Sequence, residues 1–352
     1  MNRLNRATVA SCPRAVSVNG FPHPDREADI QTRDATPDAG MIAQDPPHPR
    51  RVLAYALLSL LCWSVPAPAA ASDQLPIGTL ADAAQASAFT PERVPGANDW
   101  NCVPTAAHPY PVVLVHGTMV NMGFTWAALA PRLKNAGYCV YALNYGHNAF
   151  SLGQRAGALT DIAASAGALK TFIDRVLAAT KAPQVDIVGH SQGGLLPHYY
   201  IKRLGGAPQV HTFIGLAPSN HGTSVSGLLA LVKKTSLING FNWATAATTA
   251  SVMQQETGSP FITALFADGD TIPGPNYVVI ATAKDLIITP YTQSFLKGNA
   301  VRNITIQDQC PADDTGHIGL PFDGPTIQNL LNILGANDPH FKPDCRGYGN
   351  SV

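Results

Sequence analysis

Ser191, Asp285 and His317 have the residue types and the chain order of a nucleophile, an acid and a base. Ser191 lies in a G-x-S-x-G pattern that runs from Gly189 to Gly193. A serine hydroxyl is a weak nucleophile, and it becomes reactive when a histidine takes its proton and a carboxylate orients that histidine. The order serine, acid, histidine therefore predicts acyl transfer through a covalent acyl-enzyme.

The segments on either side of Ser191 supply the context that such a nucleophile needs. Residues 184–188 form a short apolar run typical of a buried strand, and residues 194–201 are typical of a helix. At a sharp turn between strand and helix the serine adopts strained backbone geometry, and the flanking glycines remove side chains that would collide. The serine oxygen then lies at the helix N-terminus, where the dipole favours negative charge. We interpret Ser191 as the nucleophile, against the alternative of a structural turn.

The acid is predicted from its position after a strand. Residues 277–281 are typical of a strand, and Asp285 falls in the loop beyond its carboxyl end, where the acid is expected. The competing carboxylates crowd close to His317 or precede this strand: Asp308, Asp313, Asp314, Asp268 and Asp270. Asp285 is therefore the predicted acid, and the alternative is an ordinary surface carboxylate.

The base is predicted by elimination among the 11 histidines. His317 follows a predicted strand at residues 301–306 and precedes a predicted helix at residues 325–334. His340 lies in the C-terminal tail, and His221 precedes the predicted acid, which is the wrong order for a base. His317 is therefore the predicted base.

A tetrahedral intermediate also requires backbone N–H donors for its oxyanion. One donor is expected from Gln192, directly after the nucleophile, and the other from the loop after the first core strand. That loop reads His116-Gly117-Thr118, and we choose the N–H of Thr118, whose hydroxyl is a candidate third donor. The alternative for Thr118 is a simple turn residue. His116 and His190 flank this centre and are expected to be structural.

Short apolar strands alternate with helices along the chain. Strands are expected at residues 112–115, 139–143, 184–188, 211–216, 277–281 and 301–306. Helices are expected at residues 126–136, 160–179, with Thr160 as N-cap, and 325–334. Continuous apolar runs of this kind are typical of parallel strands covered on both faces. Right-handed crossovers then give an α/β fold with a mostly parallel central sheet flanked by helices.

Residues 224–265 interrupt this alternation and are predicted to form a small helical cap or lid insertion over the strand ends, where open α/β sheets bind ligands. The residues expected to line an acyl pocket or lid are apolar: Leu228, Leu229, Val232, Ile238, Phe241 and Trp243. As a lid they would shield an acyl chain from water. The alternative is that they pack into the core of the cap, and the two interpretations are compatible.

The first 71 residues are predicted to be a leader. Residues 1–49 are rich in Pro, Arg and Asp, a composition that does not bury enough apolar surface to order a chain. Residues 50–71 contain two arginines, an apolar run and several small residues, which is the pattern of a secretory signal peptide. The apolar run is shorter than the roughly 20 residues of a membrane span, so no transmembrane segment is expected. Because a secretory signal normally lies at the N-terminus and this one begins at residue 50, the sequence favours a translation start at Met41.

The rest of the chain divides into an N-terminal arm at residues 72–108 and a catalytic domain at residues 109–352, long enough for one large core. The leader holds 7 of the 23 basic and 6 of the 23 acidic residues, which leaves 16 against 17. This balance, with no basic stripe among aromatic residues, excludes nucleic acid as an expected partner. We expect a monomer.

Four cysteines lie beyond the leader: Cys102, Cys139, Cys310 and Cys345. Export to an oxidising compartment favours disulfides, and four cysteines permit three pairings. Proximity along the chain favours Cys102–Cys139 and Cys310–Cys345, and the alternative is four buried thiols. The spacings do not match a zinc site, and no metal or cofactor is expected.

These motifs resemble the α/β-hydrolase superfamily and, within it, the secreted bacterial lipases of class 2. The matching stretches are residues 111–118, residues 189–194, and Asp285 with Thr289-Pro290. A second, local resemblance is to Candida antarctica lipase B, through Ala217-Pro218, Gly222-Thr223, Ser251 to Gln255 and Thr257 to Ser259. The resemblance implies a metal-independent carboxylic-ester hydrolase with Ser191, Asp285 and His317 as its triad.

The predicted function is a secreted serine ester hydrolase, most simply a triacylglycerol lipase acting on a lipid or another carboxylic ester at a lipid–water interface. One alternative is the same chemistry on polyesters, phospholipids or amides, because the fold and the triad do not select the leaving group. The other is a non-catalytic binding module with a hydrolase fold. That module is disfavoured because a degenerate copy is expected to lose a triad residue.

Overall fold

Parallel strands form one open sheet in the computed structural model, which describes residues 74–149, 151–224, 226–227, 230–231, 234, 249–298 and 301–346. Within these residues the strands are β1 (Val112–Val115), β2 (Val140–Leu143), β3 (Val185–His190), β4 (Val210–Leu216), β5 (Asn276–Ala281) and β6 (Val301–Thr305). Their order is β2-β1-β3-β4-β5-β6, and every neighbouring pair is parallel. The structure therefore confirms the predicted α/β architecture with a parallel sheet.

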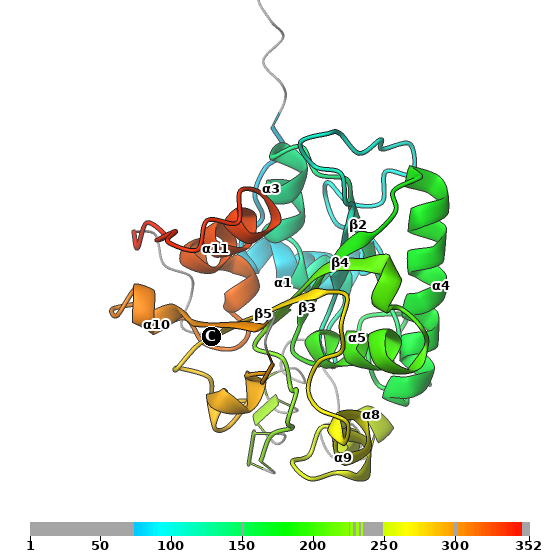
Figure 1. Ribbon diagram of the computed structural model, residues 1–352, viewed down its shortest axis with the longest axis vertical. Coiled ribbons are helices and arrows are strands. Elements are labelled where there is room, and N and C mark those ends of the chain that lie inside the picture. The colour runs from blue at the N-terminus through cyan, green and yellow to red at the C-terminus, as the bar shows by residue number, and fades with distance from the viewer. Residues whose placement is uncertain are drawn as a thin grey trace, which may run out of the picture. The chain divides into compact units, whose positions relative to one another are not determined.

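Helices cover both faces of this sheet, as Figure 1 shows: α4 and α5 lie on one side, and α3 and α11 lie on the other. The described α-helices are α1 (Leu80–Phe89), α2 (Met122–Thr125), α3 (Leu129–Asn135), α4 (Ile162–Thr180), α5 (Gln192–Arg203), α8 (Ala250–Gln254), α9 (Pro260–Phe266), α10 (Ile306–Gln309) and α11 (Gly324–Leu334). Short 3-10 turns lie at Ala207–Gln209, Tyr291–Ser294 and Leu320–Phe322.

Alternating strand residues build a separate core on each face of the sheet. On β1, Val113 and Val115 pack in the cluster that contains residues of α4 and α5. Val112 and Leu114 pack in the cluster that contains residues of α3 and α11. Because successive side chains of a strand point to opposite faces, a strand covered on both sides must be apolar throughout. This explains why β1 is a continuous apolar run.

Some helix boundaries differ from the sequence-based expectation. The N-cap of α4 is Asp161 and not Thr160, because the Asp161 carboxylate accepts a hydrogen bond from the N–H of Ala164 at 2.8 Å. The helix expected at residues 126–136 begins at Leu129. The arm contains a helix, α1, that was not expected; Thr79 and Asp82 form a capping box at its start.

Both predicted disulfides are present. Cys102–Cys139 joins the end of the arm to the residue before β2, and Cys310–Cys345 holds the C-terminal segment against the end of α10. Each closes a loop whose cross-linking stabilises a fold by about 3–4 kcal/mol in the chain-entropy estimate. Among the described residues, no helix is both long and apolar enough to cross a membrane.

His198 of α5 is fully buried among aromatic rings. Its ring centroid lies 4.9 Å from that of Phe213 and 5.2 Å from that of Phe266. Desolvation, with smaller contributions from Lys202 and His221, lowers the pKa of His198 to about 3. The folded protein therefore holds a neutral imidazole at a pH where an unfolded chain protonates it.

We expect the free energy of unfolding to fall as the pH drops from 6.5 towards 3. In this window the unfolded state binds a proton on His198 that the native state does not, which corresponds to about 1.4 kcal/mol per pH unit. Replacing His198 with phenylalanine is expected to reduce this slope, measured by urea unfolding between pH 4 and pH 7. The exposed His340→Phe variant is the control, and an unchanged slope in His198→Phe would contradict the prediction.

Candidate active site

Ser191 lies at the sharp turn between β3 and α5. It is the N-cap of α5 and has φ 57° and ψ −124°, a backbone conformation that residues other than glycine rarely adopt. A Cβ at Gly189 would lie 1.9 Å from the carbonyl oxygen of Gly193, and a Cβ at Gly193 would lie 2.0 Å from that of Val115. The two glycines of the motif are therefore required by close backbone contacts.

Asp285 and His317 meet directly, as predicted for an acid and a base. The Nδ1 atom of His317 lies 2.8 Å from Oδ2 of Asp285, and both side chains are at most 2% exposed. The other carboxylate oxygen of Asp285 accepts hydrogen bonds from the N–H groups of Ile287 and Ile288, each at 2.8 Å. Since a carboxylate only accepts hydrogen bonds, Nδ1 carries the proton of a neutral His317 and Nε2 is left as the basic atom.

Ser191 and His317 line the same pocket. Within the described residues, neither Ser191 Oγ nor His317 Nε2 has a hydrogen-bond partner, although both atoms are buried. The pocket is also lined by Gly117 and Thr118. Catalytic hydrogen bonds often form fully only in the substrate complex, so the two unpaired atoms are placed to act together on a bound molecule.

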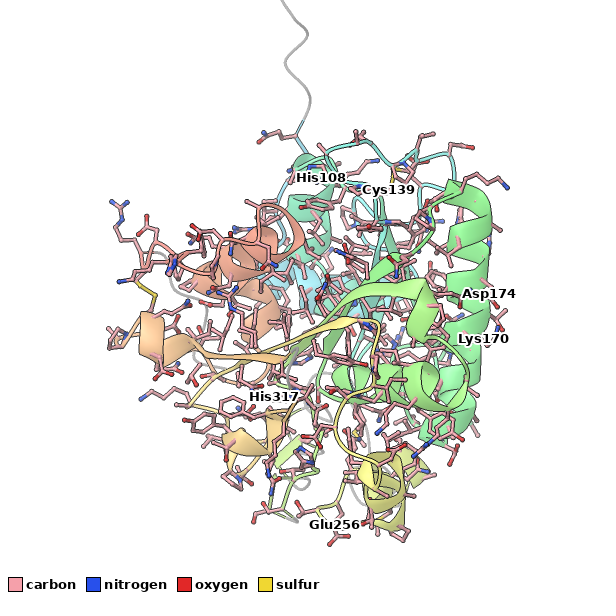
Figure 2. The ribbon with its side chains drawn as sticks, viewed as in Figure 1. His108, Cys139, Lys170, Asp174, Glu256 and His317 are labelled. Atoms are coloured by element: carbon pink, nitrogen blue, oxygen red, sulfur yellow. A yellow bond between two sulfur atoms is a disulfide. The ribbon has the colours of Figure 1, made fainter. Side chains whose placement is uncertain are left out.

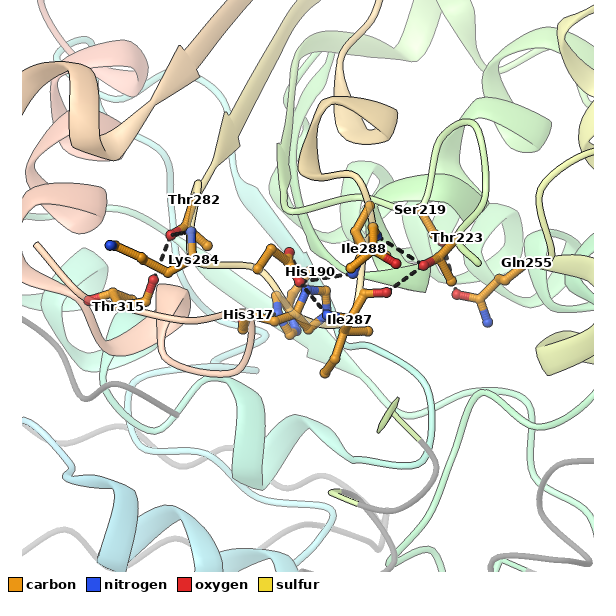
Figure 3. Close-up of polar contacts among 12 residues, drawn as sticks. His190, Ser219, Thr223, Gln255, Thr282, Lys284, Ile287, Ile288, Thr315 and His317 are labelled. Atoms are coloured by element: carbon orange, nitrogen blue, oxygen red, sulfur yellow. Dashed lines mark hydrogen bonds and ion pairs between the residues drawn. The ribbon is translucent and has the colours of Figure 1, made fainter. Parts of the chain in front are cut away.

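The loop that carries Asp285 is tied to neighbouring loops, as Figure 3 shows. The Thr223 hydroxyl donates to the carbonyl oxygen of Ile287, and it accepts a hydrogen bond from the N–H of Thr289 at 3.0 Å. The Thr282 hydroxyl donates to the carbonyl oxygen of Thr315 at 2.6 Å, which joins this loop to the loop that carries the histidine. The acid and the base therefore come from two loops that are bonded to each other.

Asp313 was a competing candidate for the acid, and the structure gives it another contact. Its carboxylate accepts a hydrogen bond from the N–H of Thr315 at 2.8 Å, and the Thr315 hydroxyl donates to Asp323 at 3.1 Å. Burial raises the pKa of Asp313, and the nearby Asp323 adds to that shift. These two carboxyl groups order the segment just before His317 and do not contact its ring in the described structure.

His190 contacts the backbone of His317 through its ring (Figure 3). A ring nitrogen of His190 lies 2.9 Å from the carbonyl oxygen of His317, and the two ring centroids are 4.8 Å apart. A carbonyl oxygen only accepts hydrogen bonds, so Nε2 of His190 carries a proton. Desolvation lowers the pKa of His190 to about 3. His190 is therefore neutral near pH 7, and its hydrogen bond holds the backbone of His317. Figure 2 marks the position of His317 in the fold.

Thr118 and Gln192, the predicted oxyanion donors, are joined through their side chains. Thr118 follows β1 and Gln192 is the first residue of α5, and no described residue accepts a hydrogen bond from either N–H. The Thr118 hydroxyl accepts hydrogen bonds from the side-chain amides of Gln192 and Gln255, each at 2.9 Å. Both backbone N–H groups are therefore without an acceptor in the described part of the chain.

Comparison with known proteins identifies the family. The sequence profile of the family described as "Lipase (class 2)" matches residues 109–323, which is more than half of the chain. The chain belongs to the class 2 lipase family. The match covers the whole segment from β1 to the residues after His317, so every predicted site residue from Thr118 to His317 lies within the matched region.

Two curated relatives of this class 2 lipase are triacylglycerol lipases, from Pseudarthrobacter phenanthrenivorans and Burkholderia plantarii. Each is 34% identical over 101 residues, which is 27% of this chain and 28% or 25% of the relative. The chain thus matches about a quarter of the length of these relatives. The crystal structure of Aspergillus fumigatus lipase B superposes with a TM-score of 0.53 at 22% identity, over 73% of this chain and 62% of that one. This similarity confirms the predicted α/β-hydrolase fold.

The six residues predicted to line an acyl pocket or lid in this class 2 lipase lie outside the described residues: Leu228, Leu229, Val232, Ile238, Phe241 and Trp243. The described insertion contains α8 and α9. Among the described residues, the pocket is lined by apolar side chains that the sequence did not single out: Val120, Phe124, Leu231, Ile318, Pro321 and Phe322. Five of them lie within six residues of Thr118 or His317 in the sequence, and Leu231 belongs to the predicted insertion.

Proposed function

We propose that this class 2 lipase is a secreted serine hydrolase that cleaves carboxylic esters, most simply triacylglycerols. The observation that carries the proposal is the buried contact of 2.8 Å between His317 and Asp285 beside the pocket that Ser191 also lines. The names of the two curated relatives support the substrate class. The two disulfides support export, because such bonds persist in oxidising compartments.

In the proposed mechanism, Nε2 of His317 takes the proton of Ser191 as the serine oxygen attacks the ester carbonyl carbon. The carbon–oxygen bond to the alcohol then breaks, and the alcohol leaves with the proton from His317. Water attacks the acyl-enzyme with His317 again as base and releases the acid and Ser191. Asp285 stabilises the charged imidazole and holds the tautomer that leaves Nε2 basic.

The backbone N–H groups of Thr118 and Gln192 hold the oxyanion in this proposal, and the Thr118 hydroxyl is a third donor. Loss of one such donor costs about 3–4 kcal/mol of transition-state stabilisation. The N-terminus of α5 adds its dipole at the same point, because Gln192 is its first residue. The apolar pocket residues support an acyl chain as the group bound beside Ser191.

The test is hydrolysis of p-nitrophenyl esters from C2 to C16 by the purified chain, together with labelling by a fluorophosphonate. A lipase is expected to be labelled and to prefer long acyl chains. A preference for short chains would indicate an esterase. If the folded protein is neither labelled nor active on any ester, the proposal is wrong and the non-catalytic binding module is favoured.

A further inference from the structure

Gln255 is not one of the reacting groups proposed above, but its side chain contacts one of them. It lies at the end of α8, within the predicted insertion, and its side chain is buried. Its Nε2 atom donates to Thr118 Oγ1 at 2.9 Å and to the carbonyl oxygen of Ser251 at 3.0 Å, and its Oε1 atom accepts a hydrogen bond from the Ser219 hydroxyl at 2.9 Å (Figure 3 labels Ser219 and Gln255). All the hydrogen-bonding atoms of this amide are therefore used.

The surroundings fix which end of each amide faces Thr118. The carbonyl oxygen of Ser251 only accepts hydrogen bonds, so the atom of Gln255 that faces it must be the NH₂ group. The same holds for Gln192, whose Nε2 atom lies 3.1 Å from the carbonyl oxygen of Ala158. Exchanging N and O in either side chain would place two acceptors against each other. Both amides therefore present an N–H donor to the Thr118 hydroxyl.

This pair of donors determines the direction of the Thr118 proton. A hydroxyl group has one proton and two lone pairs. Since the side chains of Gln192 and Gln255 both donate to Oγ1, the hydroxyl proton must be donated elsewhere. No described residue accepts it, and Thr118 lines the pocket that contains Ser191. The remaining direction for the proton is therefore towards the pocket.

We propose that Gln255 is a positioning residue that holds the Thr118 hydroxyl with its proton directed at the oxyanion of the tetrahedral intermediate. The inference rests on the proposed ester hydrolysis. It adds a residue of the insertion to the groups that position the oxyanion donors. Without the second amide donor, one lone pair of Oγ1 is free, and the hydroxyl rotates among several partners. Gln255 thus makes the hydroxyl a fixed donor before substrate binds.

The test is a double-mutant cycle of Gln255→Met and Thr118→Val, with p-nitrophenyl ester turnover as the first readout. Thr118→Val is expected to lower kcat by about 100-fold, as for the loss of an oxyanion donor, and Gln255→Met by about 10-fold with little change in KM, because the donor is only misdirected. The double variant is expected to match Thr118→Val alone. The matched control is Gln254→Met. Gln254 is the neighbour of Gln255 at the end of α8, and its side chain forms hydrogen bonds with Asp161 and Ile162 but does not contact Thr118.

A second readout separates this role from a general loss of structure. A trifluoromethyl ketone forms an oxyanion adduct with the serine, and its inhibition constant is expected to rise by the same factor as kcat/KM falls. Ser219→Ala, which removes only the partner of Gln255 Oε1, is the milder variant if Gln255→Met does not fold, and it is expected to give a smaller effect of the same kind.

The inference is overturned if the effects of Gln255→Met and Thr118→Val multiply, if Gln254→Met reproduces the loss, or if the inhibition constant does not change. In those cases the wild-type protein still hydrolyses esters, so the proposed function stands. Absence of ester hydrolysis in the folded wild-type protein would instead overturn the proposed function and this inference with it.

Discussion

Replacing Ser191 with alanine is expected to lower kcat for p-nitrophenyl ester hydrolysis by about 10⁶-fold and to abolish fluorophosphonate labelling. The reason is that the hydroxyl supplies the oxygen that bonds to the acyl group, and no neighbouring group replaces it. The residual rate would come from direct attack of water on the bound ester, with the oxyanion donors still stabilising the transition state. The fold is expected to persist, because Ser191 Oγ has no hydrogen-bond partner in the described structure and its removal leaves no group unpaired.

The measurement pairs initial rates with thermal unfolding of each variant. Ser165→Ala is the matched control, since Ser165 is a buried serine of α4 that bonds Thr160 away from the pocket. It is expected to keep near-full turnover, and Ser191→Ala is expected to melt close to the wild-type temperature. More than one per cent of wild-type turnover in a folded Ser191→Ala variant would show that another group is the nucleophile.

Asp285→Asn is expected to lower kcat by about 10⁴-fold while leaving the fold intact. The oxygen of Asp285 that accepts the N–H groups of Ile287 and Ile288 must remain an acceptor, so an asparagine will place its carbonyl oxygen there. Its NH₂ group then faces His317 Nδ1 and donates to it. This donation forces the imidazole proton onto Nε2, and the base can no longer take the proton of Ser191.

Nitrogen chemical shifts of the His317 ring test this argument independently of turnover. The wild-type ring is expected to be protonated at Nδ1, and the ring in Asp285→Asn at Nε2. The control is Asp314→Asn, an exposed carboxylate in the loop before His317, which is expected to retain activity. Near-full activity of Asp285→Asn would mean that another carboxylate orients the base, and Asp313→Asn would then be the next variant to measure.

The sheet was predictable from the sequence because its central strands are buried on both faces. Val112–Val115 is apolar throughout, and all six residues of Val185–His190 are buried although Asp186 and His190 are polar. Helix α1 was missed because its alanine-rich sequence has little contrast between its faces, and only the capping box at Thr79 and Asp82 marks it. The start of α4 was one residue wrong because two adjacent side chains, Thr160 and Asp161, are both acceptable caps.

The residues proposed to react were predictable because chain order and loop position restrict them, and the structure brings Asp285 and His317 into contact. The residues that support them were not. Gln255 contacts Thr118 across a long separation in sequence, and only the folded chain places its amide there. His190 could be assigned as structural, but its contact with the backbone of His317 depends on how β3 and the loop after β6 approach each other.

The groups of the proposed site follow β1, β3, β5 and β6, so they are spread along the chain from Thr118 to His317. A ribosome makes them in that order. A chain that is still being synthesised holds a nucleophile without its base until the residues after β6 have emerged. The proposed triad therefore cannot form until the chain has been synthesised beyond β6 and His317 can reach Asp285.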